Sequence, residues 1–309
     1  MINILGKRYL FFAISMLVII PGLILAVVKG LPMAIDFTGG TLLEVSFESG
    51  TPPPPEEVIQ LYTELGVADA QVQTTEEGFI IARSSFLDDS TRNKMVAAME
   101  EKFQETVTVR RFDSVGPTIG QEVTTRAGLA VAVAAIVVVI YITYAFRGIP
   151  HAFRYGICAI IAMVHDVAVV FSLVAIGGVF FGWQVDALFL TALLTVIGFS
   201  VQDKIVVFDR IRENSNIYRR LPFETLVNHS IIQTLQRSIN TQLMTVEFML
   251  FALALFGGVT LREFAVILLV GLFSGTYSSI FIAAPTLVAW ENREWRNWFG
   301  RGKGKEALA

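Results

Sequence analysis

Apolar residues gather along this chain in long blocks, separated by shorter polar stretches. Six of the blocks approach or exceed the length of about 20 residues that an α-helix needs to cross a bilayer. They lie at Tyr9–Val28, Ala127–Phe146, Tyr155–Phe181, Leu188–Phe208, Thr241–Gly258 and Phe264–Trp290. The pattern therefore predicts an α-helical membrane protein with six transmembrane helices.

Composition agrees with this prediction. The chain has 309 residues, of which 54% are hydrophobic and 17% charged, whereas about 25% of the residues of a soluble domain are charged. Its one cysteine, Cys158, cannot form a disulfide within the chain, so any domain outside the cytoplasm must be held by its own core. The first apolar block follows Lys7 and Arg8 and is long enough for an uncleaved signal anchor.

Basic residues predict the topology, because they are enriched in cytoplasmic loops. They lie before the first block, between the second and third, after the fourth and after the sixth. We therefore expect both termini in the cytoplasm and residues of about 30–126 outside. The expected parts are 1–30 with the first helix, the exterior domain 31–126, a five-helix bundle 127–292 and a basic tail 293–309. A cytoplasmic loop is expected at about 210–232 within the bundle.

The exterior segment has the composition of a soluble domain. Its pattern predicts strands at Thr41–Phe47, Ala70–Thr75, Phe79–Ser84 and Val107–Phe112. It also predicts a helix that starts with Pro52–Pro55 and the two glutamates after them and runs to about Leu65, and a second helix at Thr91–Gln104. The run Asp88, Asp89 and Ser90 is expected to cap the second helix. The order βαββαβ is that of an α+β ferredoxin-like domain. The segment contains no histidine, no ligands at metal spacing and no nucleophile paired with a base, so we predict that the protein is not an enzyme.

Gln202, Asp203 and Lys204 interrupt the fourth apolar block. An ionisable side chain at membrane depth costs at least a few kcal/mol (about 2.5–3.5 kcal/mol on insertion scales) unless it is paired or hydrated, so its presence indicates function. Asp203 lies six residues before Asp209, which is expected at the cytoplasmic interface, and is therefore roughly 9 Å deeper along the helix. Lys204 either extends outward to the interface or neutralises a partner.

A polar stripe leads into the fifth block, where Arg237, Asn240, Thr241 and Thr245 recur at helical spacing. It fits either a hydrated crevice between helices or an amphipathic helix on the cytoplasmic surface. Further polar residues within the blocks are Asp166, beside His165 in the third, and Glu247 in the fifth. Small residues of the sixth block, Gly271, Ser274, Gly275, Ser278 and Ser279, favour close helix packing over a polar path.

A short motif follows the first block, with Asp36 three residues before the pair Gly39 and Gly40. Paired glycines permit positive φ, and an aspartate can accept hydrogen bonds from backbone N–H groups. The motif predicts an ordered structural joint between the first helix and the exterior domain rather than a binding site.

Four segments together resemble the SecF family of the resistance-nodulation-division superfamily. They are 36–40, Val115–Gly120, Ile197–Asn214 and Gln233–Thr241. The six-helix plan with one large exterior loop is also similar to that family, and the resemblance covers essentially the whole chain.

The resemblance implies a subunit of the bacterial inner membrane that pairs with a separate SecD chain. With SecD it would use the proton-motive force, with protons as coupling ion and no other cofactor, to export unfolded polypeptides through SecYEG, with YidC as a further partner and no nucleic acid. It also implies that Asp203 is the carboxylate of the proton path and Arg237 its counterpart. From their polar side chains in or beside the apolar blocks, we expect a supporting polar path of Gln202, Asn240, Thr241, Thr245, Asp166 and Glu247. Lys204 stands where the resemblance leads us to expect a small or uncharged residue.

Two other functions remain open from the sequence. One is a proton-coupled exporter of lipids or drugs from the same superfamily, although such proteins typically carry two large exterior loops in a twelve-helix chain. The other is a scaffold that holds SecD or YidC without conducting protons.

Overall fold

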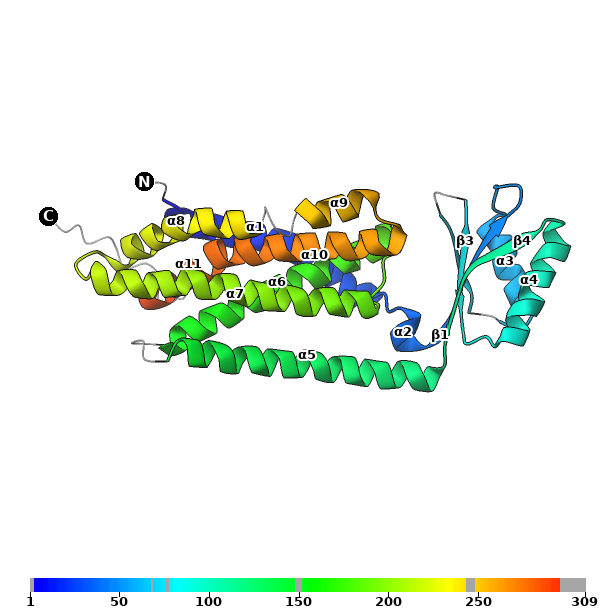
Figure 1. The fold of residues 1–309 in the computed structure, drawn as a ribbon, viewed down its shortest axis with the longest axis horizontal. Coiled ribbons are helices and arrows are strands. Elements are labelled where there is room, and N and C mark those ends of the chain that lie inside the picture. The colour runs from blue at the N-terminus through cyan, green and yellow to red at the C-terminus, as the bar shows by residue number, and fades with distance from the viewer. Residues whose placement is uncertain (1–2, 68, 76–77, 148–151, 243–247, 295–309) are drawn as a thin grey trace. The chain divides into compact units, whose positions relative to one another are not determined.

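The computed structural model describes residues 3–67, 69–75, 78–147, 152–242 and 248–294. The chain divides into two compact units, Met33–Ala130 and the combined segments Met1–Pro32 and Val131–Ala309. The first unit contains a β-sheet with two packed helices, and the second consists of helices (Figure 1).

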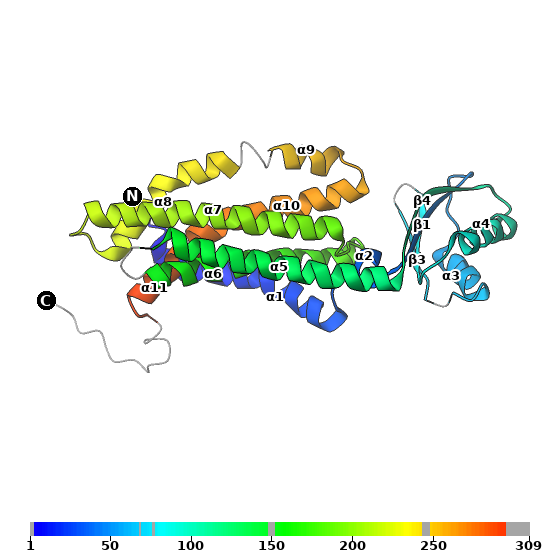
Figure 2. The same cartoon turned by 60° about the horizontal axis from the view of Figure 1, so that its bottom comes forward.

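The sheet unit begins with the short helix α2 (Ile35–Thr38). It continues as β1 (Gly40–Phe47), α3 (Pro55–Glu64), β2 (Gln71–Thr74), β3 (Ile80–Ser84), α4 (Asp89–Phe103) and β4 (Val107–Val115). Neighbouring strands are antiparallel, and their order in the sheet is β2-β3-β1-β4. Each strand and helix predicted for this segment is present, and β4 continues beyond the predicted end to Val115. Both α3 and α4 lie on the same side of the sheet (Figure 2).

Alternation along β1 places its apolar side chains toward these helices. Leu43, Val45 and Phe47 are buried, whereas the residues between them are partly exposed. They form one apolar core with the buried Met95 and Met99 of α4. The predicted cap of α4 is confirmed, because the side chain of Asp88 accepts a hydrogen bond from the backbone N–H of Thr91.

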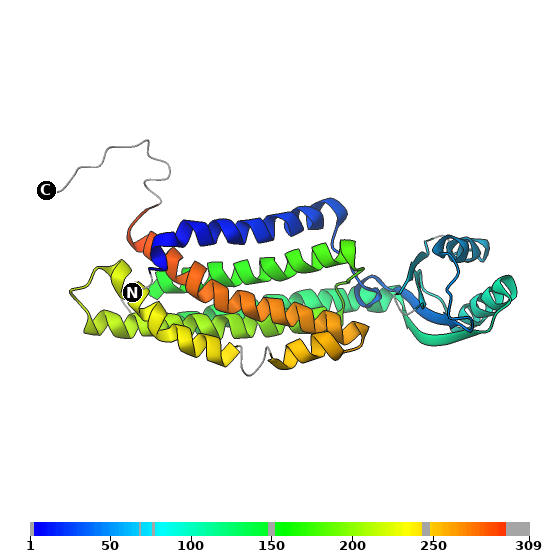
Figure 3. The same cartoon turned by 90° about the horizontal axis from the view of Figure 1, so that it is seen from above.

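The helical unit contains α1 (Arg8–Lys29), α6 (Ala152–Phe180), α7 (Ala187–Ile217), α8 (Phe223–Gln242) and α9 (Phe248–Phe256). The helix α5 (Pro117–Ala145) belongs to this unit from Val131 onward. The last stretch joins α10 (Val259–Ser278), the π-helical segment η3 (Ser279–Ala283) and α11 (Ala284–Glu291). α1 packs along α6, and α10 packs against both α6 and α7 (Figure 3).

Five helical stretches among the described residues are long and apolar enough to cross a membrane. They are Leu5–Lys29, Pro117–Ala145, Phe153–Phe180, Ala187–Ile217 and Leu261–Glu291. The span predicted at Thr241–Gly258 does not appear as one such helix: α8 ends at Gln242, α9 has 9 residues, and 243–247 lie outside the described residues.

The cytoplasmic segment predicted at about 210–232 is largely helical. α7 continues to Ile217 and α8 begins at Phe223, so only 218–222 are non-helical. Ion pairs one turn apart support the polar end of α7, Arg210 with Glu213 at 2.5 Å and Arg212 with Asp209 at 2.7 Å. The helix therefore extends past the end of its apolar block.

Arg8, the first residue of α1, links this helix to the ends of α8 and α11. Its guanidinium pairs with Glu224 of α8 at 2.9 Å and with Glu294, just after α11, at 2.6 Å. The start of the chain is fixed to the same place, because the backbone N–H of Ile4 donates to Asn228 Oδ1 at 2.9 Å. These contacts hold α1, α8 and α11 together at one end of the helical unit.

Candidate intramembrane carboxylate site

Asp203 lies on the buried face of α7 and is only 8% exposed. Both of its carboxylate oxygens accept hydrogen bonds from serines. Ser238 Oγ of α8 donates to Oδ1 at 2.8 Å, and Ser279 Oγ of η3 donates to Oδ2 at 2.5 Å. Among the described residues no cation forms an ion pair with Asp203, so hydroxyl groups are its direct partners.

A second buried carboxylate, Asp166 of α6, has a different environment. Lys204 Nζ lies 2.7 Å from Asp166 Oδ2, and both side chains are almost completely buried. The other partners of Asp166 are Ser200 at 2.6 Å, Ser274 and Ser278 at 2.7 Å, and His165 Nδ1 at 3.1 Å. Asp166 therefore has a cation of its own and several hydrogen-bond donors.

The two carboxylates differ in what they can do chemically. A lysine beside a buried carboxylate favours the ionised form. A serine hydroxyl can donate to a carboxylate and can also accept from a carboxylic acid. Asp203 can therefore take up or release a proton while Ser238 and Ser279 remain hydrogen-bonded, whereas Asp166 is held as the anion of an ion pair.

The stretch from α10 to η3 reaches both carboxylates. Ser278, the last residue of α10, donates to Asp166, and Ser279, the first of η3, donates to Asp203. π-helical turns within α-helices frequently occur at functional sites. Close approach of α10 to α7 requires Gly271, since a Cβ there would lie 2.3 Å from Val196 Cγ2. The glycine allows α10 to present its serines to residues of α6 and α7.

Several predicted site residues do not join this cluster. Gln202 is exposed on α7, and Arg237, Asn240 and Thr241 are exposed on α8. No ion pair joins Arg237 to Asp203 within the part of the chain that the structure describes. Ser238, the neighbour of Arg237, is the buried residue that bonds to Asp203. Thr245 and Glu247 lie outside the described residues.

Two interpretations of the sequence need correction. Lys204 does not extend outward, because its side chain is 0% exposed; the alternative, that it neutralises a partner, is confirmed by its pair with Asp166. The second concerns three serines of the sixth block, for which the sequence analysis favoured a role in close helix packing. Their hydroxyl groups also donate hydrogen bonds to the buried carboxylates. These are Ser274, Ser278 and Ser279.

Ser200 and Ser238 were missed by the sequence analysis. Ser200 precedes Lys204 by one helical turn, and its backbone carbonyl accepts from Lys204 Nζ at 3.2 Å. That spacing was available as a signal, because side chains four residues apart share a helix face. No comparable signal marks Ser238, whose bond to Asp203 joins two helices.

The glycine pair of the motif at 36–40 has the backbone that the sequence predicts. Gly39 has φ of 74° and Gly40 has φ of 125°. A Cβ on Gly39 would lie 2.8 Å from Pro117 Cα, so this glycine is also needed for space. Asp36 lies in α2, one turn before the pair. The function of these residues as a joint remains a prediction.

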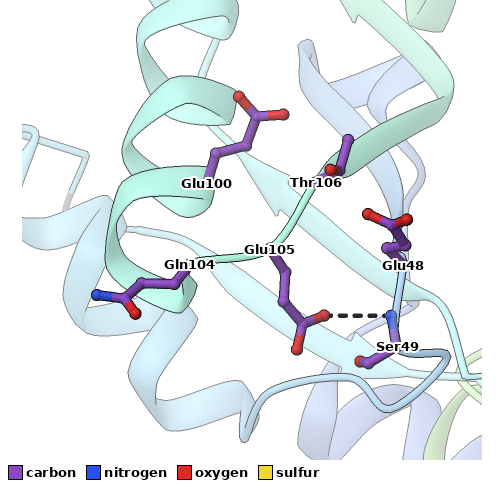
Figure 4. Close-up of a pocket in the computed structure, with 6 residues that line it drawn as sticks. All are labelled: Glu48, Ser49, Glu100, Gln104, Glu105 and Thr106. Atoms are coloured by element: carbon purple, nitrogen blue, oxygen red, sulfur yellow. Dashed lines mark hydrogen bonds between the residues drawn. The ribbon is translucent and has the colours of Figure 1, made fainter.

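An acidic hollow lies in the sheet unit, lined by Glu48, Ser49, Glu100, Gln104, Glu105 and Thr106 (Figure 4). Glu105 Oε2 accepts from the backbone N–H of Ser49 at 3.3 Å. Within the described ranges, no group of three or more His, Cys, Asp or Glu residues is placed to hold a metal ion.

Two protein-family models match the chain. The SecD/SecF GG motif matches residues 24–51, which include the paired glycines. The C-terminal part of the protein export membrane proteins SecD/SecF matches residues 95–293, which include both carboxylates.

Individual relatives match over nearly the whole chain. The protein translocase subunit SecF of Anaerolinea thermophila is 72% identical over 302 residues, 98% of each chain. The SecF subunit of Thermobaculum terrenum is 46% identical over 99% of each chain. The crystal structure of SecDF, a translocon-associated membrane protein from Thermus thermophilus, superposes with a TM-score of 0.82 at 33% identity. That match covers 94% of this chain and 39% of the SecDF chain.

Proposed function

The chain belongs to the SecF family of protein translocase subunits, part of the Sec export machinery, and on that premise we propose that it uses the proton-motive force to promote export. The observation that carries the proposal is the environment of Asp203. A buried carboxylate whose direct partners are two serine hydroxyls is equipped to bind and release a proton.

The proposed partner is a separate SecD chain. The related SecDF of Thermus thermophilus is one polypeptide, and this chain matches 39% of it. We place the pair in the bacterial inner membrane, next to SecYEG and YidC, with six spans and both termini in the cytoplasm. The exterior domain, of ferredoxin-like topology, would contact the unfolded polypeptide as it emerges.

The proposed coupling begins with the proton on Asp203. When the carboxylate becomes an acid, Ser238 or Ser279 must change from donor to acceptor, which alters the contact of α7 with α8 or with η3. A shift of α8 would bring the exposed Arg237 toward the carboxylate. A guanidinium there would favour release of the proton.

The available energy is sufficient for such a change. A proton that crosses a potential of 100 mV releases about 2.3 kcal/mol. Moving a two-state equilibrium from 1:99 to 99:1 takes about 5.5 kcal/mol. A few protons can therefore shift the helices, and through α1 and residues 36–40 the exterior domain, between two states.

Proton flux into vesicles that contain the chain and SecD tests the proposal. Asp203→Asn keeps the shape of the side chain but cannot exchange a proton, and it is expected to abolish potential-driven flux. Asp209→Asn is the matched control, because Asp209 is an exposed carboxylate on the same helix, paired with Arg212. Undiminished flux in Asp203→Asn would end the proposal.

A non-conducting scaffold for SecD or YidC is the second candidate. It is favoured by the absence of an ion pair between Arg237 and Asp203 among the described residues. Export is measured with and without a proton gradient in the double variant Asp203→Asn/Arg237→Gln. A scaffold predicts an unchanged response to collapse of the gradient, whereas the proton-coupled function predicts that the response disappears. Membership of the SecF family argues against the lipid or drug exporter.

A further inference from the structure

Lys204 is a fully buried cation next to Asp203 in the sequence. Its ammonium group pairs with Asp166 across the contact between α6 and α7. It also donates to both the hydroxyl and the backbone carbonyl of Ser200. An ion pair at this depth needs complete hydrogen bonding to offset the loss of hydration. The side chains of Asp166 and Lys204 are both hydrogen-bonded in this way.

The pair lies beside Asp203. Lys204 follows Asp203 on α7, and two adjacent serines link the carboxylates, because Ser278 donates to Asp166 and Ser279 donates to Asp203. Other charged or titratable groups on the surrounding helices include His165, next to Asp166 on α6, Tyr277 of α10, whose ring stacks on that of His165, and the exposed Arg237 on α8. The described residues of α10 and η3 contribute hydroxyl groups, from Ser274, Ser278 and Ser279.

We propose that Asp166 and Lys204 are positioning residues of the proton site, a neutral pair that balances the charge around Asp203 and holds α6, α7 and α10 in contact there. The inference rests on the proposed function and gives it a component that the family resemblance does not supply. Because both members are charged, either one without the other would leave an uncompensated charge near Asp203.

The sign of each effect follows from this balance. Lys204→Met leaves the anion of Asp166, which repels a second negative charge, so Asp203 keeps its proton to higher pH. Asp166→Asn leaves the ammonium of Lys204, which attracts the ionised carboxylate, so Asp203 loses its proton at lower pH. The double variant removes both charges and returns the titration of Asp203 toward that of the unmodified chain.

Labelling with dicyclohexylcarbodiimide, which reacts with protonated carboxylic acids in apolar surroundings, tests the inference without requiring transport. The full chain is labelled together with SecD in membrane vesicles over a range of pH. Mass spectrometry of the peptide that contains Asp203 gives the pH of half-maximal labelling. Shifts of about one pH unit, a tenfold change in proton affinity, are expected in opposite directions for the two single variants. Asp209→Asn is expected to cause no shift.

Opposite shifts in the single variants and their cancellation in the double variant would support the inference. Unchanged midpoints, or shifts of the same sign in both single variants, would overturn it and leave the pair a structural element only. If Lys204→Met does not accumulate, the downward shift in Asp166→Asn and its absence in Lys204→Arg, which retains the charge, are the test. Failure of the proposed function would appear separately, as proton flux that persists in Asp203→Asn.

Discussion

The sheet unit and the helical unit differ in the chemistry of their buried side chains. The core of the sheet unit is apolar, with Leu43, Val45, Met95 and Met99 buried between the sheet and its two helices. The helical unit buries charges, and Asp166 and Lys204 are almost inaccessible. Water drives apolar side chains together, but lipid is as apolar as leucine and gives helices little reason to associate.

Polar contacts and close packing therefore stabilise the association of the helices, whereas burial of apolar area stabilises the packing of the sheet unit. Side chains of α6, α7 and α10 meet at Asp166, and side chains of α7, α8 and η3 meet at Asp203. The same groups that hold the helices together are the ones that bind the proton in the proposed function. A change of protonation can then change the packing directly, which an apolar core does not allow.

The largest loss of stability is expected from Lys204→Met. Removing one member of a buried ion pair leaves the other unpaired, at a cost of about 3–5 kcal/mol in the free energy of unfolding. Denaturant unfolding in mild detergent measures the cost. In the double variant Lys204→Met/Asp166→Asn the cost should be well below the sum of the single variants. Additive costs would show that the two side chains do not stabilise the fold as a pair.

Met99→Ala is the corresponding change in the apolar core of the sheet unit. Met99 is 0% exposed, and its truncation leaves a cavity that is expected to cost about 2–5 kcal/mol in the free energy of unfolding. Met16 on α1 is 52% exposed and provides the control, since lipid or detergent replaces the contacts that Met16→Ala removes. Equal losses in both variants, measured by unfolding of the full chain, would contradict the contrast between the two units.

The two units also differ in how far the sequence predicts them. In the sheet unit the decisive signals are local: prolines before α3, the alternation of β1 and the cap at Asp88 fix the elements within a few residues. In the helical unit, the hydropathy pattern correctly located five of the six predicted spans. It does not give the ends of the helices: α7 continues beyond its apolar block to Ile217, where polar residues form ion pairs along the helix surface.

The arrangement of the site depends on helix rotation, which hydropathy does not encode. Asp203 and Asp166 stand out in the sequence because both are ionisable residues in apolar blocks. The pairing of Lys204 with Asp166, which are 38 positions apart, depends on which faces of α6 and α7 meet. The same is true of Ser238 and Ser279, which reach Asp203 from α8 and η3.

A smaller, pH-dependent effect is expected at the start of α4. The hydrogen bonds from Thr91 hold the pKa of the exposed Asp88 at about 2, below its ordinary value of 3.8. Because the pKa is lowered in the folded state, the stabilisation is complete above about pH 4 and is lost as the pH falls toward about 2. Hydrogen exchange of the α4 amides in the full chain should accelerate over this range. In Asp88→Asn, which keeps an acceptor for the cap but cannot titrate there, the acceleration should be absent. Identical pH profiles in the two chains would contradict this account.

Removal of a single hydroxyl group is expected to change stability differently in the two units. Burial raises the pKa of Tyr62 in the sheet unit, and its hydroxyl has no hydrogen-bond partner among the described residues. Tyr62→Phe is therefore expected to leave stability unchanged or to raise it by up to about 1 kcal/mol. Ser279→Ala removes a donor to Asp203 and should cost about 1–3 kcal/mol, because one oxygen of a buried carboxylate loses its partner. Unfolding of both variants in the same detergent compares them directly. A loss of stability in Tyr62→Phe would mean that this hydroxyl is satisfied, and a neutral Ser279→Ala would mean that Asp203 does not depend on η3.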